Sequence, residues 1–430
     1  MRIVELTEDT KKNILEDLLK RSPNHYGEYE KVVADIVNDV MQNGDDAIFS
    51  YTKRFDKWDV NASNVRVTNK EIQDAYTQVD EQLLEVIKES AENIRAFHEK
   101  QLRESWIIPK EDGTILGQKI TPIQSAGCYA PGGKAYYPSS VLMNIIPAKV
   151  AGVEKIVLCT PARPDGSVHP VTLVAASVAG ADEIYKIGGA QAIAAMAFGT
   201  ASVPKVDKIT GPGNIFVALA KKAVFGYVGI DSVAGPSEIL VLADETANPR
   251  FVAADLLSQA EHDELASAIL ITTSKELAKE VSRQVDIFTN ELSRKEIIEK
   301  SLENYGYILV AESMEDAILA ANEIASEHLE ILTKDPYQVM TKIKNAGAIF
   351  LGEYSSEPLG DYFAGPNHIL PTNGTARFFS PLNVDDFTKK TSIISYSKEA
   401  LKKVHGKIEY FAKQEQLTAH ANSIRVRFEK

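Results

Sequence analysis

Residues 258–264 (SQAEHDE) place an amide side chain and an imidazole three positions apart, at Gln259 and His262. Residues at i and i+3 share one face of a helix, so both side chains can reach one metal ion. Imidazole is the commonest protein ligand for zinc, and a hard oxygen beside it suits a Lewis-acid metal. No second histidine follows at the spacing of a metallopeptidase helix, so further ligands must come from elsewhere. A surface histidine at a helix end is the alternative interpretation.

A second candidate pair, Glu327 and His328, adjoins the end of another expected helix. His328 shares a helix face with apolar residues, so a core histidine that bonds to the backbone is one interpretation. Both this pair and the Gln259–His262 pair sit where a helix runs into the next strand. In a parallel sheet such positions lie at the same edge, so we expect the two pairs to lie close together.

A loop rich in glycine and proline contains Asp361 and His368, and either side chain could complete a metal site. Asp361 follows an expected strand, 348–351, whereas the other candidates precede strands. Its loop must therefore cross the sheet edge, or the last strand must run in the opposite direction. Glu415 and His420 lie in the tail, near an expected junction of two helices. The remaining histidines sit among polar residues and are expected at the surface: His25, His98, His169 and His405.

Three glycine-bearing loops follow expected strands, at 132–133, 188–189 and 211–213. In an open parallel sheet, ligands bind beyond the carboxyl ends of the strands, and glycine there lets backbone amides approach a phosphate. These loops predict a nucleotide site, with simple tight turns as the alternative. The dinucleotide fingerprint is absent, because the last loop lacks the third glycine and the strand that ends in Cys159 presents no ribose-binding acid.

Strand-like apolar runs alternate with small-residue helices from about residue 120, and again from Glu238. This alternation predicts parallel sheets with right-handed crossovers. The expected class is α/β, with two incomplete Rossmann-like parallel-sheet domains, an N-terminal helical arm and a small C-terminal tail domain. The expected parts are the arm at 1–25, a discontinuous catalytic and metal-binding domain at 26–125 and 238–380, a nucleotide-binding domain at 126–237, and the tail at 381–430. The tail is too small to stand alone.

Size and charge exclude several classes of protein. A chain of 430 residues is too long to fold around a single hydrophobic core, so at least two domains are expected. The net charge of −13 argues against nucleic acid and anionic membranes as partners. Two cysteines, Cys128 and Cys159, cannot form a disulfide framework and indicate a reducing, cytoplasmic location. The N-terminus has no apolar signal core, and the apolar run 187–203 is shorter than the ~20 residues of a membrane span.

Five stretches carry a family resemblance: YAPGGKAYYPSSVLMN, IDSVAGPSEILVLAD, SQAEHD, SEHLEI and GDYFAGPNHILPT. Together, and in this order, they resemble histidinol dehydrogenase over nearly the whole chain. The resemblance implies zinc-dependent, four-electron oxidation of L-histidinol to L-histidine through L-histidinal with two NAD+, the last two steps of histidine biosynthesis. It also implies a homodimer with exchanged C-terminal tails, in which each tail completes the partner's site.

The resemblance also implies roles for individual residues. The implied zinc ligands are Gln259, His262, Asp361 and His420, and the implied catalytic pair is Glu327 and His328. The implied substrate contacts are Ser237, Gln259, His262, His328, Asp361, Glu415 and His420. The implied NAD+ contacts are Tyr129, Gln191 and Asn214. His328 is expected to take the alcohol proton, and Glu327 to activate the water that adds to the aldehyde.

Three other functions fit parts of the sequence. An aldehyde dehydrogenase could use Cys128 as a covalent nucleophile, but no base or oxyanion donor is identifiable beside it. We expect Cys128 to be structural. A metallohydrolase could use Gln259, His262 and Asp361 without a nucleotide. A binding protein could place two α/β halves around a cleft, although the expected lack of a signal peptide disfavours it.

Overall fold

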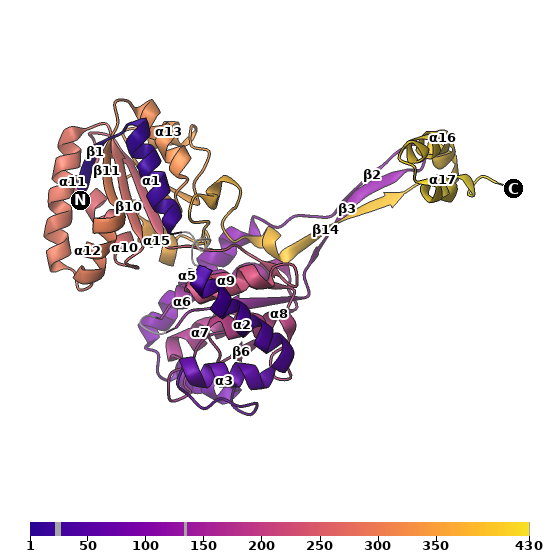
Figure 1. Ribbon diagram of the computed structural model, residues 1–430, viewed down its shortest axis with the longest axis horizontal. Helices are drawn as coiled ribbons and strands as arrows, with labels where there is room; N and C mark the ends of the chain where they lie inside the picture. Colours follow the sequence, from indigo (N-terminus) through magenta and orange to yellow (C-terminus); the bar gives the residue numbers. More distant parts are fainter. Residues whose placement is uncertain (22–26, 133–135, 430) are drawn as a thin grey trace. The chain divides into compact units, whose positions relative to one another are not determined.

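The computed structural model describes residues 1–21, 27–132 and 136–429. The chain divides into two compact units (Figure 1). The first unit comprises Met1–Gln101 and Ile123–Phe387, and the second comprises Leu102–Pro122 and Thr388–Lys430. No helix within the described ranges is long and apolar enough to cross a membrane. Two expectations, a surface position for His25 and a glycine loop at Gly133, concern residues outside these ranges.

A five-stranded parallel sheet in the first unit has the order β6-β5-β4-β7-β8. Its strands are β4 (Ser125–Tyr129), β5 (Lys155–Cys159), β6 (Glu183–Tyr185), β7 (Lys208–Thr210) and β8 (Gly229–Ile230). Its crossover helices are α6 (Pro138–Ala151), α7 (Pro170–Ala179), α8 (Gly189–Phe198) and α9 (Ile215–Val224). The β–α alternation inferred from the sequence is confirmed here. Strands β5 and β6 lie on one side of β4, whereas β7 and β8 lie on the other. The strand order therefore reverses between β4 and β7, which makes a topological switch point.

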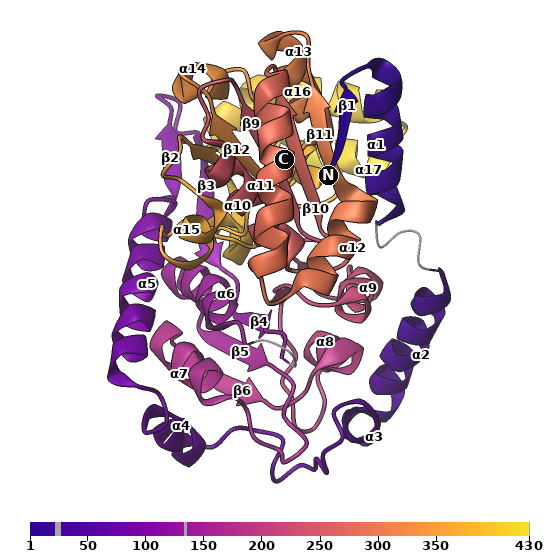
Figure 2. The ribbon, with the colours of Figure 1, turned by 90° about the vertical axis from the view of Figure 1, so that its left-hand side faces the viewer.

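Four N-terminal helices cover this sheet: α2 (Gly27–Asn43), α3 (Asp45–Phe55), α4 (Asn69–Tyr76) and α5 (Glu81–Glu99). Apolar residues of α2 and α3 share a core with α8 and α9, whereas those of α4 and α5 share a core with α6 and α7 on the opposite face (Figure 2). The sequence-based grouping of 26–125 with the metal-binding domain differs from this packing. An apolar stripe predicts one buried face but does not specify which sheet covers it. The domain boundaries themselves stay a prediction.

A six-stranded parallel sheet, also in the first unit, has the order β1-β11-β10-β9-β12-β13. Its strands are β1 (Arg2–Glu5), β9 (Glu238–Ala243), β10 (Ser267–Thr272), β11 (Gly306–Val310), β12 (His328–Leu332) and β13 (Ala348–Leu351). One face packs against α10 (Pro249–Ala260), α11 (Lys275–Glu291) and α12 (Lys295–Tyr305) (Figure 1). The other face packs against α1 (Glu8–Lys20), α13 (Met314–Ile324) and α14 (Pro336–Met340).

Two local expectations need correction. The N-terminal arm is not wholly helical, because β1 pairs with β11 at the sheet edge before α1 begins. Four residues are too few for a periodic pattern, so the sequence did not distinguish this strand. The loop expected at 352–374 contains a short helix, α15 (Glu357–Tyr362). Pro358 stands in its first turn, where the fixed φ of proline favours a helix start.

The second unit is an antiparallel sheet with two helices. Its strands are β2 (Trp106–Pro109), β3 (Ile115–Pro122) and β14 (Thr388–Ser395), in the order β14-β3-β2. Helices α16 (Lys398–Gln414) and α17 (Thr418–Arg425) follow. The strand and two helices expected in the tail are confirmed, and strands from before residue 123 join them. Two short 3-10 helices, η2 (Thr375–Arg377) and η3 (Val384–Phe387), belong to the first unit.

Candidate active site and metal centre

The pair Glu327 and His328 lies where α13 turns into β12. Ala325 ends α13 in the left-handed conformation, with φ of 53°, so the chain reverses within three residues. The start of β13 approaches the same turn at Gly347, where a Cβ atom would lie 2.4 Å from the carbonyl oxygen of Glu327. Only glycine therefore fits at this position. Both side chains of the pair are buried.

The backbone of Glu238 orients the ring of His328. Nδ1 lies 3.0 Å from the carbonyl oxygen of Glu238, and because a carbonyl only accepts, Nδ1 carries the proton. Nε2 is buried without a hydrogen-bond partner among the described residues, 3.9 Å from Oδ1 of Asp361. Burial lowers the pKa of His328, so the ring is neutral and Nε2 offers a free lone pair. The core-histidine interpretation therefore accounts for Nδ1 alone.

Glu327 is held by the same residue. Its Oε2 accepts the backbone N–H of Glu238 at 2.9 Å and lies 3.8 Å from Nδ1 of His328. Burial raises the pKa of Glu327 well above its ordinary value, and neighbouring carboxylates raise it further. The pair thus combines a neutral imidazole with a carboxyl group of increased basicity.

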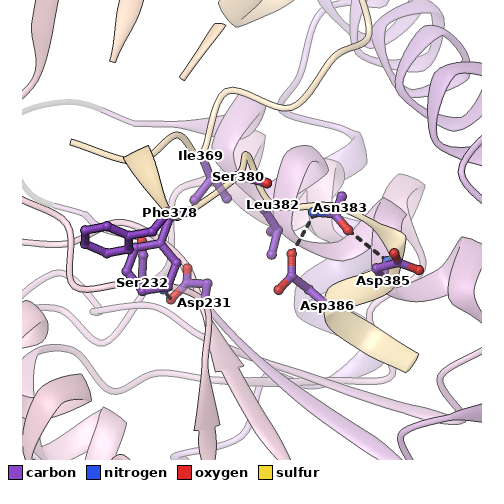
Figure 3. A pocket seen from close by; sticks show the side chains of 10 residues that line it. Asp231, Ser232, Ile369, Phe378, Ser380, Leu382, Asn383, Asp385 and Asp386 are labelled. Atoms are coloured by element: carbon purple, nitrogen blue, oxygen red, sulfur yellow. Dashed lines mark hydrogen bonds between the residues drawn. The ribbon is translucent and has the colours of Figure 1, made fainter. Parts of the chain in front are cut away.

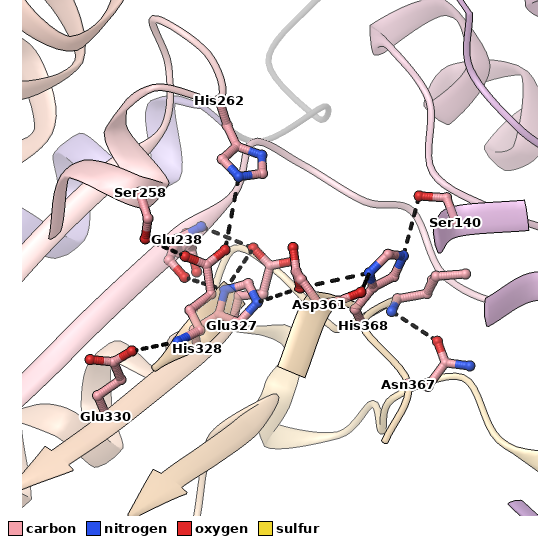
Figure 4. A network of polar contacts seen from close by, with 12 residues as sticks. Ser140, Glu238, Ser258, His262, Glu327, His328, Glu330, Asp361, Asn367 and His368 are labelled. Atoms are coloured by element: carbon pink, nitrogen blue, oxygen red, sulfur yellow. Dashed lines mark hydrogen bonds and ion pairs between the residues drawn. The ribbon is translucent and has the colours of Figure 1, made fainter. Parts of the chain in front are cut away.

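Gln259 and His262 lie at the C-terminal end of α10, whose N-terminus is capped by Asn248 as its sequence predicts. Gln259 is fully buried, yet neither amide atom bonds to any residue that the structure describes. His262 follows the helix in a turn whose N–H donates to the carbonyl of Gln259 at 3.1 Å. Its imidazole is partly exposed and points toward the acidic cluster in Figure 4. The expected meeting of the two pairs at one sheet edge is confirmed, because Asp361 and Glu357 connect them.

Asp361 reaches this edge through α15. Strand β13 runs parallel to β12, so the first of the two alternatives for Asp361 is right and the chain recrosses the sheet. The N–H of Glu357 donates to Oε1 of Glu330, in β12, at 2.8 Å and anchors the start of α15 there. Glu357 and Asp361 are four residues apart and therefore share a helix face. Asp361 then lies beside His328 in Figure 4.

Glu357 is a site residue that sequence reasoning missed. Its Oε2 accepts a hydrogen bond from Oγ of Ser258 at 2.6 Å, and its Oε1 lies 3.8 Å from Nε2 of His262. Burial, followed by the charge of Asp361, raises the pKa of Glu357 to about 7. One ligand atom from each of His262, Glu357 and Asp361 lies within 4.8 Å of the others. Its four-residue spacing from Asp361 was the available signal, but it lay in a segment expected to be irregular.

The chemistry of this cluster fits a divalent cation. The carboxylates of Glu327, Glu357 and Asp361 converge, and no lysine or arginine is labelled beside them in Figure 4. The neighbouring Glu238 is paired with Arg21. Burying carboxylates without a cation is unfavourable, so a metal ion and a cationic ligand would stabilise the cluster. The unpartnered amide oxygen of Gln259, the imidazole of His262 and the carboxylate of Asp361 are donors that zinc accepts.

His368 lies on the other side of Asp361. Its Nδ1 donates to the carbonyl oxygen of Asp361 at 3.1 Å, and its Nε2 is 3.2 Å from Oγ of Ser140 (Figure 4). Because Nδ1 carries the proton, Ser140 donates to Nε2. Burial lowers the pKa of His368, so it is neutral. We therefore assign His368 to support of the Asp361 loop.

The residues expected to contact NAD+ lie at the carboxyl edge of the five-stranded sheet. The hydroxyl of Tyr129, at the end of β4, accepts the N–H of Gly189 at 3.1 Å. Gln191 is 1% exposed, and neither of its amide atoms has a partner within the described chain. Asn214 caps α9. At Gly211 a Cβ atom would lie 2.1 Å from the carbonyl oxygen of Tyr129, so β4 and the α9 loop meet closely at the switch point.

Comparisons with known proteins agree with this arrangement. A family model described as histidinol dehydrogenase matches residues 19–428. The chain belongs to the histidinol dehydrogenase family. The histidinol dehydrogenase of Halalkalibacterium halodurans is 59% identical over 400 residues, covering 93% of this chain and 94% of that protein. That of Clostridium acetobutylicum is 55% identical, covering 96% and 95%. The crystal structure of histidinol dehydrogenase from Elizabethkingia anophelis superposes with a TM-score of 0.92 at 38% identity, covering 99% and 98%.

Three further residues are expected from the histidinol dehydrogenase family, one in the first unit and two in the second. Ser237 directly precedes β9, and its carbonyl accepts the N–H of Ser267 at 3.0 Å. Glu415 and His420 belong to the second unit, at the end of α16 and in α17. Both are exposed there. Their roles stay predictions.

Cys128 does not have the surroundings of a nucleophile, which disfavours a cysteine-dependent aldehyde dehydrogenase. The residue is fully buried in β4, and burial raises the pKa of its thiol to about 12. Oγ1 of Thr210 lies 3.8 Å from its sulfur. A thiol that stays protonated is a poor nucleophile. This agrees with the structural role expected for Cys128.

Two other features lie apart from the predicted site residues. A hollow of about 280 Å³ is lined by Asp231, Phe378 and Asn383 among others, and none of the predicted site residues lines it (Figure 3). Asp231 accepts the N–H of Gly211 at 2.8 Å and thereby supports the glycine turn. The surface position expected for His98 is wrong. Its ring is buried on the inner face of α5, and Nδ1 lies 2.7 Å from the carbonyl of Ile94.

Proposed function

We propose that this protein oxidises L-histidinol to L-histidine through L-histidinal, in two hydride transfers to NAD+, with one zinc ion per subunit. The observation that carries the proposal is His328, a buried neutral imidazole whose Nδ1 donates to Glu238 and whose Nε2 faces Asp361. A free lone pair beside metal-binding groups is what a general base for an alcohol requires. Membership in the family supports histidinol as that alcohol.

The proposed metal ligands in the first unit are Gln259, His262 and Asp361, with His420 of the partner subunit as the fourth. The unpartnered amide of the buried Gln259 supports this assignment. When bound, the ion supplies charge stabilisation and orients the amine and imidazole nitrogens of the substrate. Glu415 of the partner subunit would accept a hydrogen bond from the substrate imidazole, and Ser237 would contact the substrate next to the catalytic pair.

The catalytic pair divides the proton transfers. In the first oxidation, Nε2 of His328 takes the hydroxyl proton while the hydride leaves the carbon. In the second, Glu327 takes a proton from the water that adds to the aldehyde, and His328 takes the hydroxyl proton of the resulting hydrate. The raised pKa of Glu327 makes its carboxylate a stronger base, and nearby cations would favour the ionised form. Each such group contributes typically ~10²–10⁴-fold in rate.

The proposed dinucleotide site uses Tyr129, Gln191 and Asn214. NAD+ accepts the hydride in each oxidation. The N-terminus of α9, which follows the turn at Gly211, favours negative charge at the switch point. The unpartnered amide of Gln191 supports a polar ligand at this edge.

We also propose a homodimer in which the second unit completes the partner's site. Large apolar side chains are exposed on this unit, on its strands and on α16, and such patches favour association with another copy. They are Trp106, Ile107, Ile108, Ile394, Tyr410 and Phe411. The exposure of Glu415 and His420 supports their use by a second subunit.

The decisive experiment measures the stoichiometry of NADH formed. Zinc-loaded protein is given limiting L-histidinol with excess NAD+, and absorbance is followed at about 340 nm. We expect two NADH per histidinol, with histidine as the product by mass spectrometry. One NADH per histidinol would contradict the second oxidation. Hydrolysis of a substrate without any absorbance change would instead favour a metallohydrolase.

A further inference from the structure

Arg21 and Glu238 form a buried ion pair, and backbone groups of Glu238 bond to Glu327 and His328. Nη2 of Arg21 lies 2.6 Å from Oε1 of Glu238, and the two side chains are 0% and 3% exposed. Nη1 of the same guanidinium donates to the carbonyl of Leu265 at 2.6 Å, and its centre lies 5.0 Å from the ring centroid of Tyr305. Arg21 comes from the chain just after α1, whereas Glu238 opens β9. The pair therefore ties the N-terminal segment to the central strands.

Both peptide groups of Glu238 face the catalytic pair. Its N–H donates to Oε2 of Glu327 at 2.9 Å, and its carbonyl accepts Nδ1–H of His328 at 3.0 Å. One residue thus places the carboxylate of Glu327, the ring plane of His328 and the proton on Nδ1. Figure 4 draws these three residues together. A shift of this peptide would move both catalytic groups at once.

Glu238 opens β9, and the bond from the N–H of Ser267 to the carbonyl of Ser237 is the pairing contact just before it. From Glu238 onward, β9 pairs with β10, but residues 231–237 before it form no strand. The side chain of Glu238 is the link from this strand end to Arg21, and Arg21 in turn fixes the carbonyl of Leu265 before β10. The ion pair therefore braces the amino ends of β9 and β10 together.

Stability alone does not explain a charged pair at this place. Apolar side chains of similar volume are often as stable as a buried ion pair, or more so, whereas removing one partner is strongly destabilising. A charged anchor has a directional use that an apolar contact lacks: the two Nη groups of Arg21 bond to the carboxylate of Glu238 and to the carbonyl of Leu265, and the rigid guanidinium fixes these two acceptors relative to each other. Here that carboxylate belongs to the residue that orients Glu327 and His328.

We propose that Arg21 and Glu238 are positioning residues for the Glu327–His328 pair: their ion pair fixes the Glu238 peptide groups, which set the orientation of Glu327 and the Nδ1–H tautomer of His328. The proposal rests on the function proposed above for that pair. It assigns no contact with substrate to either residue. A misplacement of about 1 Å in a catalytic group can reduce rate by ~10²-fold.

The test compares single and double variants in the whole enzyme. Arg21→Met leaves the buried Glu238 charge unpaired, so this variant can fail to fold. The double variant Arg21→Met/Glu238→Leu removes both charges and is expected to fold. Its kcat per folded, zinc-loaded protein should fall ~10–100-fold, with KM for histidinol and zinc content within about twofold. Arg21→Lys should retain more activity than Arg21→Met, because it restores the charge.

The matched control is Lys208→Met. It breaks a partly buried ion pair with Asp386 at the amino end of β7, where Nζ lies 3.0 Å from Oδ1. This control should lower stability but leave kcat per folded protein unchanged. If the double variant behaves like this control, the ion pair is merely structural and the proposal is overturned.

A second readout does not depend on turnover. Proton–nitrogen correlation spectra of histidine-labelled protein report the tautomer of His328, whose signals are assigned with His328→Asn. We expect an Nδ1–H tautomer in the parent and a mixture of tautomers in the double variant. An unchanged tautomer would contradict the proposal even if activity fell. If the tautomer changes in the double variant but the parent protein does not oxidise histidinol, the positioning role is retained and the proposed function is refuted.

Discussion

The carboxylate of Glu357 faces the imidazole of His262, with 3.8 Å between Oε1 and Nε2. Glu357 is not among the four ligands that the family resemblance implies, yet it is buried beside two of them. The charge of Asp361 contributes to its raised pKa, so the two carboxylates repel each other when no cation is near. Glu357 therefore adds negative potential at the proposed metal site without needing to be a ligand.

Glu357→Gln should weaken zinc binding and stabilise the metal-free protein. The amide keeps the shape but removes the charge, so the affinity should fall ~10–100-fold, as for other groups adjacent to ligands. Competition with a chromophoric chelator measures the affinity, and thermal unfolding with and without chelator measures stability. Glu353→Gln, at an exposed position nearby, is the control. Unchanged zinc affinity would show that the carboxylate does not act on the ion.

Substitutions of the catalytic pair should separate the two oxidations. His328→Asn removes the base used in both and should slow both by ~10²–10⁴-fold. Glu327→Gln should slow mainly aldehyde oxidation, because only that step needs water activated. Rates are measured separately with histidinol and with histidinal as substrates. Equal losses in the Gln variant would contradict the assignment of Glu327 to water.

Mixed dimers should recover histidine formation from two variants that are each deficient in it. In a hybrid of a His420→Asn subunit and a Glu327→Gln subunit, one exchanged site carries both defects and the other is intact. Random exchange would then restore about a quarter of parental activity, since about half the dimers are hybrids with one good site each. Mass spectrometry confirms that subunits have exchanged. No recovery after confirmed exchange would count against a shared site.

Asp56→Asn should stabilise the protein at neutral pH but not in acid. Burial raises the pKa of Asp56 to about 6, above its ordinary value of 3.8, although the N–H of Gly188 opposes the shift. As pH rises from about 4 to about 6, the unfolded chain releases this proton before the folded chain does, so stability falls. The asparagine variant lacks this penalty. Its advantage should be about 1–2 kcal/mol above pH ~6, because partial exposure screens the charge, and should vanish below pH ~4.

Urea unfolding at about pH 4 and about pH 7.5 measures this difference. Asp59→Asn is the control, because the Asp59 side chain is 84% exposed. An equal gain at both pH values would show that the effect is not due to the charge of Asp56.

Chelators should abolish activity, whereas thiol alkylation should not. Burial raises the pKa of Cys128 to about 12 and also raises that of Cys159, so neither thiol reacts appreciably in the folded protein. Activity is measured after iodoacetamide, with mass spectrometry to count modified cysteines, and after chelation followed by zinc. Loss of activity on modification of Cys128 alone would instead support a covalent mechanism with Cys128 as the nucleophile.

Much of the fold could be predicted because parallel strands are buried on both faces. The apolar run 348–351 coincides with β13, and the helix expected at 170–179 coincides with α7. Ser313 was expected to cap a helix, and α13 does begin directly after it. The side chain of Ser313 accepts the N–H of Asp316. The partner of the amphipathic helices was not predictable. Their pattern encodes one apolar face but no sheet, and here that sheet is the five-stranded one.

The candidate site could be predicted where its residues form a local sequence pattern. Gln259, His262, Glu327 and His328 stand at helix-to-strand turns, and parallel topology brings such turns to one edge. Glu238 and Arg21 had no such signal. Glu238 stands at the start of an apolar strand, and its contact with Arg21 spans 217 positions of sequence. Such a pairing depends on the order of strands, which apolar periodicity does not encode.

The placement of His262, His328 and Asp361 at the amino edge of their sheet has an electrostatic consequence. Helices of a parallel α/β unit end at this edge, so α10 and α13 direct the partial negative charge of their C-terminal carbonyls toward the cluster. The opposite edge of the five-stranded sheet presents helix N-termini and partial positive charge. The amino edge of the six-stranded sheet therefore favours a cationic group such as an ammonium. The carboxyl edge of the five-stranded sheet favours an anionic group such as a pyrophosphate.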